Sequence, residues 1–409
     1  MHIVVLGAGV VGVTTAYYLT ERGHTVTVVE RAAAFASGAS CGNGGQLSYS
    51  FTDALASPAL LSKLPGIIAG ANPAFYVHPR VNTQLLGWGL DFLRQCTVAK
   101  NQKNTVAVLK LALRSGELME KLRTRTLLEF SHRRASKLVM MDGPKALEEA
   151  RGICDLKNRH GCDAEPISLE RAIDLEPALA HMNNKYVGAI YSQSDEVGDS
   201  LVFTSRLGKW LSDNHDVEFL MNTTVLDITA RGGKLTTVET DSGPLTPDAV
   251  VVCLGAWSYE LLQKLGITAR IYPMRGYSVT LPSLKTSNFV SITDPGSKTV
   301  FTRLGDQVRI AGFADFVGYR TAKDDTRART LIETAQKTAP KIGDFSAKSI
   351  NQWGGFRPMT PNSQPLLGPC AIEGEEMAMR IAERVVGITD KLKIPYVFKG
   401  SFKKASFFL

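Results

Sequence analysis

The feature that most constrains the fold is a glycine-rich turn between a short apolar run and a segment with helical periodicity. Residues 3–6 are apolar, as expected of a buried parallel strand, and residues 7–12 read Gly-Ala-Gly-Val-Val-Gly. The following helix-like segment leads to a second apolar run, residues 25–29, which ends at Glu30. This order of strand, glycine turn, helix and strand predicts a βαβ unit that binds a dinucleotide.

Each glycine of the turn has a physical role in that prediction. Gly7 permits a tight turn, Gly9 allows a pyrophosphate to approach the backbone, and Gly12 lets helix and strand pack closely. The helix N-terminus offers N–H groups to the phosphates, and Glu30 can accept hydrogen bonds from ribose hydroxyls. Glu30 also disfavours a 2′-phosphate, so NADP is the dinucleotide that the sequence favours least. A strand–helix turn without a ligand stays open as the alternative.

Composition places the chain among soluble globular proteins. It has 409 residues, 44% hydrophobic and 21% charged, enough for one large domain or two interleaved ones. The net charge of +8 could attract anionic ligands, or it could reflect a basic surface exposed to solvent. The densest basic stretch, residues 121–137, has little aromatic interleaving, which argues against nucleic-acid binding. The six cysteines include no Cys-x-x-Cys pair, and we expect no disulfide framework and no metal site.

The sequence shows no targeting or membrane-spanning segment. The chain opens directly into its first apolar run, and the best later run, residues 55–71, is broken by Pro58, Lys63 and Pro65. We therefore expect a cytoplasmic protein, and peripheral contact with the inner membrane stays open.

Three further segments bear on the kind of dinucleotide. Residues 37–47 read SGASCGNGGQL, a glycine content that suggests backbone wrapped closely round a large flat ligand, or a flexible loop. A buried-strand run, residues 248–254, ends in Gly-Ala-Trp-Ser after a hairpin expected to turn at residues 232–233. Residues 354–361 read GGFRPMTP and precede NSQPLLGP.

Together these motifs resemble the D-amino-acid oxidase superfamily of FAD-dependent oxidoreductases. Within it, Asn-Gly-Gly-Gln at residues 43–46 and Asp-Glu-x-Gly-Asp at residues 195–199 resemble the bacterial D-amino acid dehydrogenase small subunits. The resemblance covers residues 1 to about 369. It implies an α/β fold, with a Rossmann-type FAD-binding domain interleaved with an antiparallel-sheet α+β substrate domain. It also implies non-covalent FAD, because Ser-Cys-Gly-Asn stands where some relatives attach the flavin through a histidine.

The resemblance and the motifs give the domain boundaries and the candidate residues. The FAD-binding domain is expected at residues 1–80, 195–265 and 345–409, and the substrate domain at 81–194 and 266–344. The candidate cofactor-binding residues are Val5, Gly7, Ala8, Gly9, Val10, Val11, Gly12, Glu30, Arg31, Ser40, Gly42, Asn43, Gly44, Gly45, Gln46, Leu47, Val225, Gly255 and Trp257.

The implied reaction is oxidative deamination of D-amino acids to 2-oxo acids and ammonia, with hydride transfer from Cα to flavin N5. Arg357 is the candidate for binding the substrate carboxylate, since a planar guanidinium binds it bidentately. Tyr277, Trp353 and Phe313 are candidate pocket walls, although residues of these types more often pack in a core than contact a substrate. No general base is evident, which suits direct hydride transfer from a neutral amine.

Two departures from the resembling family keep alternatives open. Ser297 stands before Lys298 where relatives commonly have tyrosine, and the segment after Pro369 lacks their Gly-His-Gly turn. The partners expected are a small amino acid and an electron acceptor, either a quinone or a redox protein. The alternatives are an enzyme for glycine, sarcosine, hydroxyproline or opines, or a catalytically silent flavoprotein subunit.

Overall fold

The fold was analysed in a computed structural model of the chain, which describes residues 1–78, 82–183, 186–231, 234–284, 290–321, 325–348 and 350–366. The chain divides into two compact units. Unit 1 is built from Met1–Ser40 and Leu201–Tyr272, together with Pro365 and Leu366 of the C-terminal segment. Unit 2 is built from Cys41–Ser200 and Pro273–Gln364.

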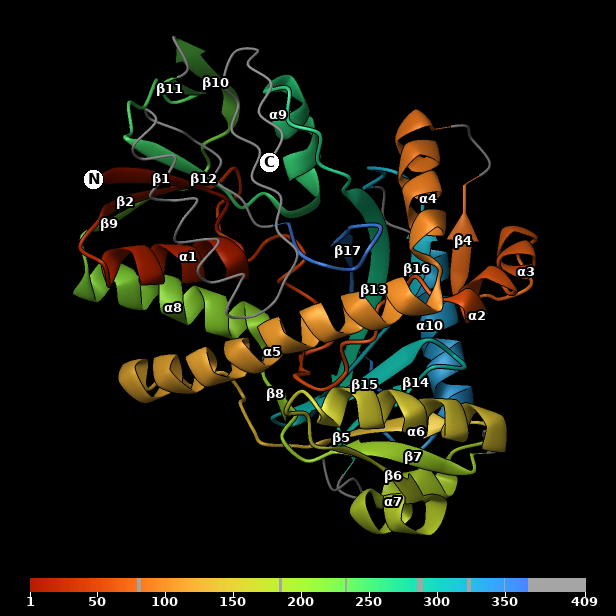
Figure 1. Ribbon diagram of the computed structural model, residues 1–409. Coiled ribbons are helices and arrows are strands. Elements are labelled where there is room, and N and C mark those ends of the chain that lie inside the picture. Colours follow the sequence, from red (N-terminus) through yellow and green to blue (C-terminus); the bar gives the residue numbers. More distant parts are fainter. Residues whose placement is uncertain are drawn as a thin grey trace. The chain divides into compact units, whose positions relative to one another are not determined.

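Unit 1 contains the predicted βαβ unit. In it, β1 (His2–Leu6), β2 (Thr25–Val29), β9 (Val217–Leu220) and β12 (Ala249–Val252) form a parallel sheet in the order β12-β1-β2-β9. Helices α1 (Val10–Thr20) and α8 (Ser200–Asn214) lie side by side on one face of this sheet (Figure 1). These strands are near-continuous apolar runs because helices and other layers cover them on both faces.

The other face of the unit 1 sheet is covered by a hairpin and a helix. The hairpin pairs β10 (Val225–Arg231) with β11 (Lys234–Thr240), which confirms the predicted hairpin, although residues 232–233 lie outside the described part. The short helix η2 (Gly255–Trp257) leads into α9 (Ser258–Lys264). Ile228 and Val238 of the hairpin and Leu261 of α9 form one core cluster with Val4 and Val250.

Unit 2 is organised round a mixed sheet. In the described part of the chain, nine strands join in the order β17-β13-β16-β15-β14-β5-β7-β6, with β4 beside β16. The neighbouring strands for which the register is described pair antiparallel, except β14 with β5 and β16 with β4, which are parallel. The strands are β4 (Phe75–Val77), β5 (Lys137–Met141), β6 (Ala164–Ser168), β7 (Gly188–Ser192), β13 (Tyr272–Pro282), β14 (Ser291–Asp294), β15 (Thr299–Leu304), β16 (Gln307–Phe316) and β17 (Asn351–Met359).

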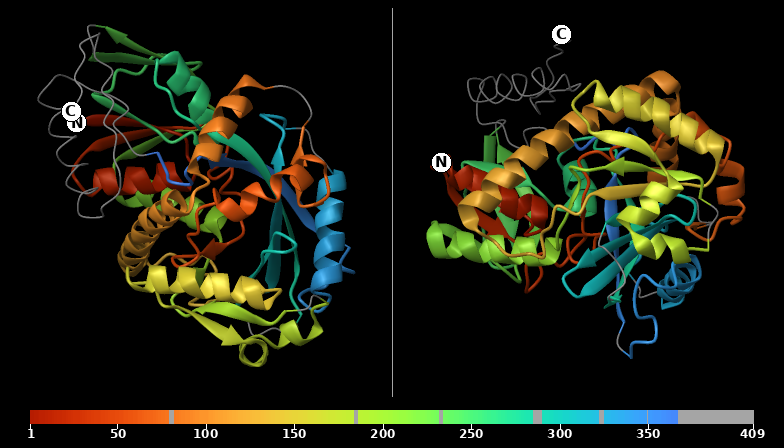
Figure 2. Two further views of the ribbon diagram at one scale, coloured as in Figure 1. Left: turned by 45° about the vertical axis from the view of Figure 1, so that its right-hand side comes forward. Right: turned by 90° about the horizontal axis from the view of Figure 1, so that it is seen from below.

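Helices cover both faces of the unit 2 sheet. Alternate residues of β5 and β7 point to opposite faces: Val139 and Ile190 pack with Cys154 of α6, whereas Leu138 and Ala189 share a core with α7 and α10. The opposite positions of α6 and α7 can be followed in Figures 1 and 2. The helices are α2 (Pro58–Leu61), α3 (Leu64–Ile68), α4 (Thr83–Gln95), α5 (Val98–Thr126), α6 (Pro144–Asn158), α7 (Leu169–Leu175), η1 (Pro177–His181) and α10 (Asp325–Thr338).

The predicted fold class is confirmed: a parallel-sheet unit of Rossmann type is interleaved in sequence with a largely antiparallel α+β unit. The boundaries of the two units differ from those of the predicted domains. Residues 41–80 and 345–364, which are predicted to belong to the FAD-binding domain, pack in unit 2. The assignment of FAD binding and substrate binding to particular segments stays a prediction. No helix of the described residues is long and apolar enough to cross a membrane.

Candidate functional site

The glycine turn of unit 1 has the geometry that its sequence predicts. Gly7 adopts φ +103°, which favours glycine, and Gly12 lies so close to it that a Cβ atom would be 1.8 Å from Gly7 O. Gly9 is the N-cap of α1 and contributes no side-chain cap, and Val11 of the first turn is 61% exposed. The turn is therefore an open helix N-terminus of the kind that receives a phosphate.

Glu30 ties the end of β2 to this turn. Its two carboxylate oxygens accept hydrogen bonds from Ala8 N (2.8 Å) and Ala32 N (2.9 Å). Ser40 Oγ accepts a hydrogen bond from Val10 N (3.0 Å), so a second candidate residue lies on the same turn. The carboxylate positions the turn in this structure, and its contact with a ribose stays a prediction.

Two of the remaining unit 1 candidates, Arg31 and Gly255, follow the carboxyl ends of the parallel strands β2 and β12. The Arg31 guanidinium stacks over the Trp257 ring at 4.6 Å, and Gly255 adopts φ +57°. Val225 begins β10, two residues after Thr223, whose N–H donates to Glu30 O (2.9 Å). Val5 lies fully buried within β1. A helix whose N-cap residue contributes no side-chain cap, glycine backbone that a phosphate can approach, and an acidic hydrogen-bond acceptor at the strand end are the features that bind a dinucleotide, so the residues present fit FAD.

The glycine-rich segment before β3 (Gln46–Leu47) packs within unit 2. A Cβ atom on Gly42 would lie 2.4 Å from Trp353 Cδ2, and one on Gly44 would lie 3.0 Å from Val300 Cγ2. Gly45 adopts φ +66°, and its N–H donates to Asn43 Oδ1 (2.9 Å). The segment is a fixed backbone held close to its neighbours, which its composition alone could not distinguish from a flexible loop.

The Asp-Glu-x-Gly-Asp motif holds this segment in place. Its first part forms β8 (Glu196–Val197), which pairs with β3. Asp195 Oδ1 accepts a hydrogen bond from Ser50 N (2.9 Å), and Gly198 N donates to Gly45 O (2.9 Å). Asp199 pairs with Arg309 (2.9 Å), a buried ion pair. The Asp-Glu-x-Gly-Asp motif, which is identifiable in the sequence only from the family resemblance, therefore holds the backbone of residues 42–50 in place.

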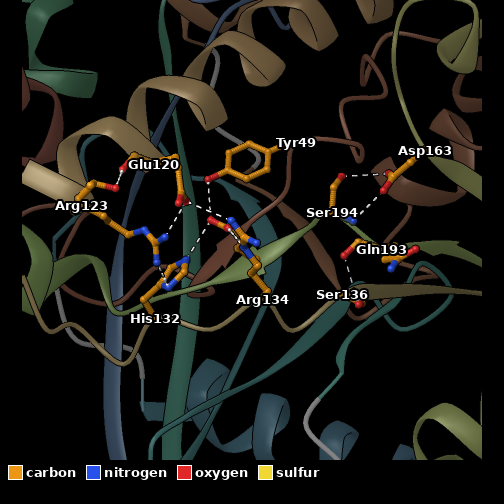
Figure 3. A network of polar contacts seen from close by, with 11 residues as sticks. Tyr49, Glu120, Arg123, His132, Arg134, Ser136, Asp163, Gln193 and Ser194 are labelled. Carbon is orange, nitrogen blue, oxygen red and sulfur yellow. Dashed lines mark hydrogen bonds and ion pairs between the residues drawn. The ribbon is translucent and has the colours of Figure 1, made fainter. Parts of the chain in front are cut away.

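Glu196 is the centre of a polar network on this scaffold. Its Oε2 accepts a hydrogen bond from Tyr49 Oη (3.1 Å) and lies 3.0 Å from His132 Nε2. Burial alone would raise the pKa of Glu196, but the adjacent His132 ring and the hydrogen bond from Tyr49 outweigh it, and the pKa is lowered. Burial beside this carboxylate raises the pKa of Tyr49. Figure 3 shows Arg123 and Arg134 converging on the same network with Glu120.

Lys137 is a buried amine behind the glycine-rich segment. Its Nζ donates to Gln46 Oε1 and to Ser48 Oγ (2.9 Å), and the residue is 1% exposed. Burial lowers its pKa to about 8, although the nearby Asp195 carboxylate opposes the shift. The sequence grouped Lys137 with a basic surface stretch, and the structure places it in the interior of unit 2.

Arg357 lies on β17 with its guanidinium against the backbone of β13. A Cβ atom on Gly276 would lie 2.6 Å from Arg357 Nη2, and Arg357 Nη1 donates to Phe313 O (3.3 Å). Arg357 forms no ion pair with a carboxylate of the described residues. Solvent reaches its side chain, yet the surrounding protein desolvates the guanidinium and lowers its pKa. Such a cation is available to an anionic ligand.

Two of the three candidate pocket walls, Tyr277 and Trp353, differ in their surroundings. Tyr277 is buried, and its hydroxyl donates to Asp315 Oδ2 (2.8 Å), which also pairs with Arg327. Trp353 is half-buried and packs against Gly42 and Gly355. Trp353 and Gly42 thus bring two predicted segments together within unit 2, whereas Tyr277 is engaged in the core. Their roles in catalysis stay predictions.

Sequence reasoning missed the residues that support these segments. They are Gly276, Lys137, Ser278, whose Oγ donates to Gly42 O (2.7 Å), and Arg309, whose Nη1 is buried without a hydrogen-bond partner in the described part. Among these contacts, the sequence signalled only the Asp199 side of the pair with Arg309, through the Asp-Glu-x-Gly-Asp motif. The described residues contain no group of three or more metal-ligating side chains. Residues 367–369, which end the NSQPLLGP segment, and the segment after Pro369, which lacks the Gly-His-Gly sequence, lie outside the described part.

Comparisons with known proteins agree with this geometry. "D-amino acid dehydrogenase 2" of Mesorhizobium japonicum is 36% identical over 370 residues, 90% of this chain and 88% of the relative. A protein of the same name from Ralstonia nicotianae is 35% identical over 399 residues, 95% of this chain and 93% of the relative.

Solved structures share the fold. Glycine oxidase from Geobacillus kaustophilus superposes with a TM-score of 0.68 at 18% identity, covering 92% of this chain and 86% of that one. L-proline dehydrogenase from P. horikoshii superposes with a TM-score of 0.67 at 19% identity, covering 92% and 85%. The family model of the FAD dependent oxidoreductases, DAO, matches residues 2–385. The chain therefore belongs to the DAO family of FAD-dependent oxidoreductases.

Proposed function

We propose that this FAD-dependent enzyme oxidises D-amino acids to 2-oxo acids and ammonia, and that Arg357 holds the substrate carboxylate. The observation that carries the proposal is the Arg357 guanidinium, which is accessible, desolvated and without an acidic partner in the described part. The preference for D-amino acids is supported by relatives at 36% and 35% identity that are named D-amino acid dehydrogenase.

Binding of the carboxylate is the main task of the protein in this reaction. FAD, when bound, supplies the acceptor for the hydride that leaves Cα. Two parallel N–H···O bonds from Arg357 fix the carboxylate and thereby limit the orientations of Cα. A guanidinium stays charged through the physiological range even when burial lowers its pKa, so it remains a carboxylate ligand.

Proton transfer requires no protein base in this proposal. The only aromatic candidate with a hydroxyl group, Tyr277, already donates a hydrogen bond to Asp315. A substrate with a neutral amine loses a hydride from Cα and then a proton from nitrogen, which leaves an imine. Water converts the imine to the 2-oxo acid and ammonia. We therefore expect kcat/KM to rise with pH as the substrate ammonium group loses its proton.

The electron acceptor and the location complete the proposal. The relatives are named dehydrogenases, which supports a quinone or a redox protein as acceptor rather than oxygen. We therefore propose a cytoplasmic location with peripheral contact with the inner membrane, because such contact would bring the enzyme to a quinone acceptor in the membrane.

A substrate panel with an artificial electron acceptor tests the proposed function. The panel contains D- and L-enantiomers of several amino acids together with glycine, sarcosine, hydroxyproline and an opine. We expect turnover of D-amino acids with formation of equal amounts of 2-oxo acid and ammonia. Turnover confined to glycine or a secondary amine would replace D-amino acids by that substrate class. A flavin-loaded protein that turns over none of them would be a silent flavoprotein.

A further inference from the structure

The support beneath Arg357 is a β-bulge between β13 and β16. Arg275 pairs with Asp315, and Tyr277 pairs with Gly312, so Phe313 and Ala314 oppose the single residue Gly276. Phe313 adopts φ +63°, a left-handed conformation that is strained for an aromatic residue. Strain of this kind persists only where the surrounding structure enforces it.

We propose that the Gly276–Phe313 bulge is a positioning device for the Arg357 guanidinium and thereby sets the affinity for the substrate carboxylate. The proposal rests on the proposed function for the role of Arg357. Gly276 supplies the space, because its missing Cβ leaves room for the guanidinium flat against the strand. Phe313 supplies the direction, because its carbonyl accepts the hydrogen bond from Nη1.

The Phe313 carbonyl is held by an anchored side chain. The Phe313 ring is 1% exposed, and the Arg327 guanidinium covers it at 4.5 Å. Arg327 is fixed in turn by Asp315, through Nε (2.9 Å) and Nη2 (2.5 Å). The ring cannot shift without breaking this buried pair. The carbonyl therefore points at Arg357 in a defined direction, and the remaining guanidinium donors are available to a ligand.

The substitution that tests the device is Gly276→Ala. The new Cβ would lie within 2.6–2.9 Å of Nη2, Cζ and Nε of Arg357. These atoms end a flexible side chain, so the guanidinium moves while the strand keeps its place. We expect the FAD-loaded variant to bind propionate, a carboxylate without an amine, about tenfold more weakly than wild type by calorimetry. Its FAD content should be unchanged.

Gly89→Ala is the matched control, because its Cβ meets nothing within 4 Å in α4. It should bind propionate as the wild type does. Arg357→Ala separates the two proposals. If Arg357→Ala binds propionate normally, the role of Arg357 in the proposed function is wrong. If Arg357→Ala loses binding and Gly276→Ala does not, only the positioning device is wrong.

A double variant distinguishes positioning from a general structural role. We expect Gly276→Ala to lower kcat/KM for the amino acid in the wild-type background and to have no effect in the Arg357→Ala background. An equal effect in both backgrounds would overturn the proposal. If Gly276→Ala fails to fold, folding of the double variant would show that the clash with the guanidinium is the cause, as the proposal requires. Misfolding of both would show that the strand itself requires glycine and would overturn the proposal.

Discussion

The indole ring of Trp353 lies directly against Gly42, so that a Cβ atom on Gly42 would be 2.4 Å from Trp353 Cδ2. Gly355 also lies against this ring, since its Cβ would lie 2.2 Å from Trp353 Cζ2. The ring is therefore in close contact with two glycine backbones. Gly42 belongs to the segment predicted to wrap the flavin, and Trp353 to the strand that carries Arg357.

Gly42→Ala should destabilise this contact, because the new methyl group would overlap the Trp353 ring and force the ring or the Gly42 backbone to shift. We expect a loss of about 1–3 kcal/mol in the free energy of unfolding and a lower FAD content after purification. Gly152→Ala, whose Cβ meets nothing within 4 Å, is the control. Recovery of FAD content in Gly42→Ala with Trp353→Ala would attribute the effect to the ring, and absence of any loss in the single variant would contradict the packing.

Gly12→Ala should abolish FAD binding. The new Cβ would lie 1.8 Å from the Gly7 carbonyl oxygen, a backbone atom that cannot move without opening the turn. The purified variant should lack flavin absorbance, whereas Gly38→Ala, with nothing within 4 Å of its Cβ, should keep it. A yellow Gly12→Ala protein would show that this turn does not carry the cofactor.

Arg309→Met should destabilise unit 2 because it removes the guanidinium from the buried Asp199 carboxylate. Breaking one side of a buried ion pair costs about 3–5 kcal/mol. The exposed pair of Arg94 with Asp91 gives the control, since Arg94→Met should cost at most about 1 kcal/mol. Denaturant unfolding measures both. Adding Asp199→Leu to Arg309→Met should recover stability, and a further loss would argue that Asp199 has another essential partner.

Lys137 predicts a pH dependence of stability. Burial lowers its pKa to about 8 from the ordinary value of 10.5. The unfolded chain therefore binds more protons than the folded chain between about pH 8 and 10.5, and the free energy of unfolding rises with pH across that window. The rise attributable to Lys137 is about 3 kcal/mol. The difference between wild type and Lys137→Met isolates it from other groups, and parallel pH profiles would contradict the burial of a charged lysine.

The sequence was sufficient for the elements whose signals are local. The glycine turn, the strands on both sides of it and the hairpin of β10 and β11 follow from apolar runs and glycine spacing, and the structure contains each of them. The family followed from motifs, and the comparisons confirm it.

Long-range packing supplied what the sequence could not show. Lys137 belongs to a basic stretch, and only the pairing of β5 within the sheet places its side chain in the interior beside Gln46. Gly276 carries no special backbone angle. Its importance comes from a bulge on β16 and from Arg357 on another strand, contacts between residues far apart in the chain. The Asp195 and Asp199 carboxylates were visible as a motif, but their partners were not.

Anaerobic mixing of the flavin-loaded enzyme with D-alanine and L-alanine tests the central claim most directly. Bleaching of the flavin absorbance by D-alanine, its absence with L-alanine, and slow bleaching of Arg357→Ala that millimolar D-alanine fails to saturate are the predicted results. Equal bleaching of wild type and Arg357→Ala, or none by either enantiomer in a protein that holds FAD, would contradict the account.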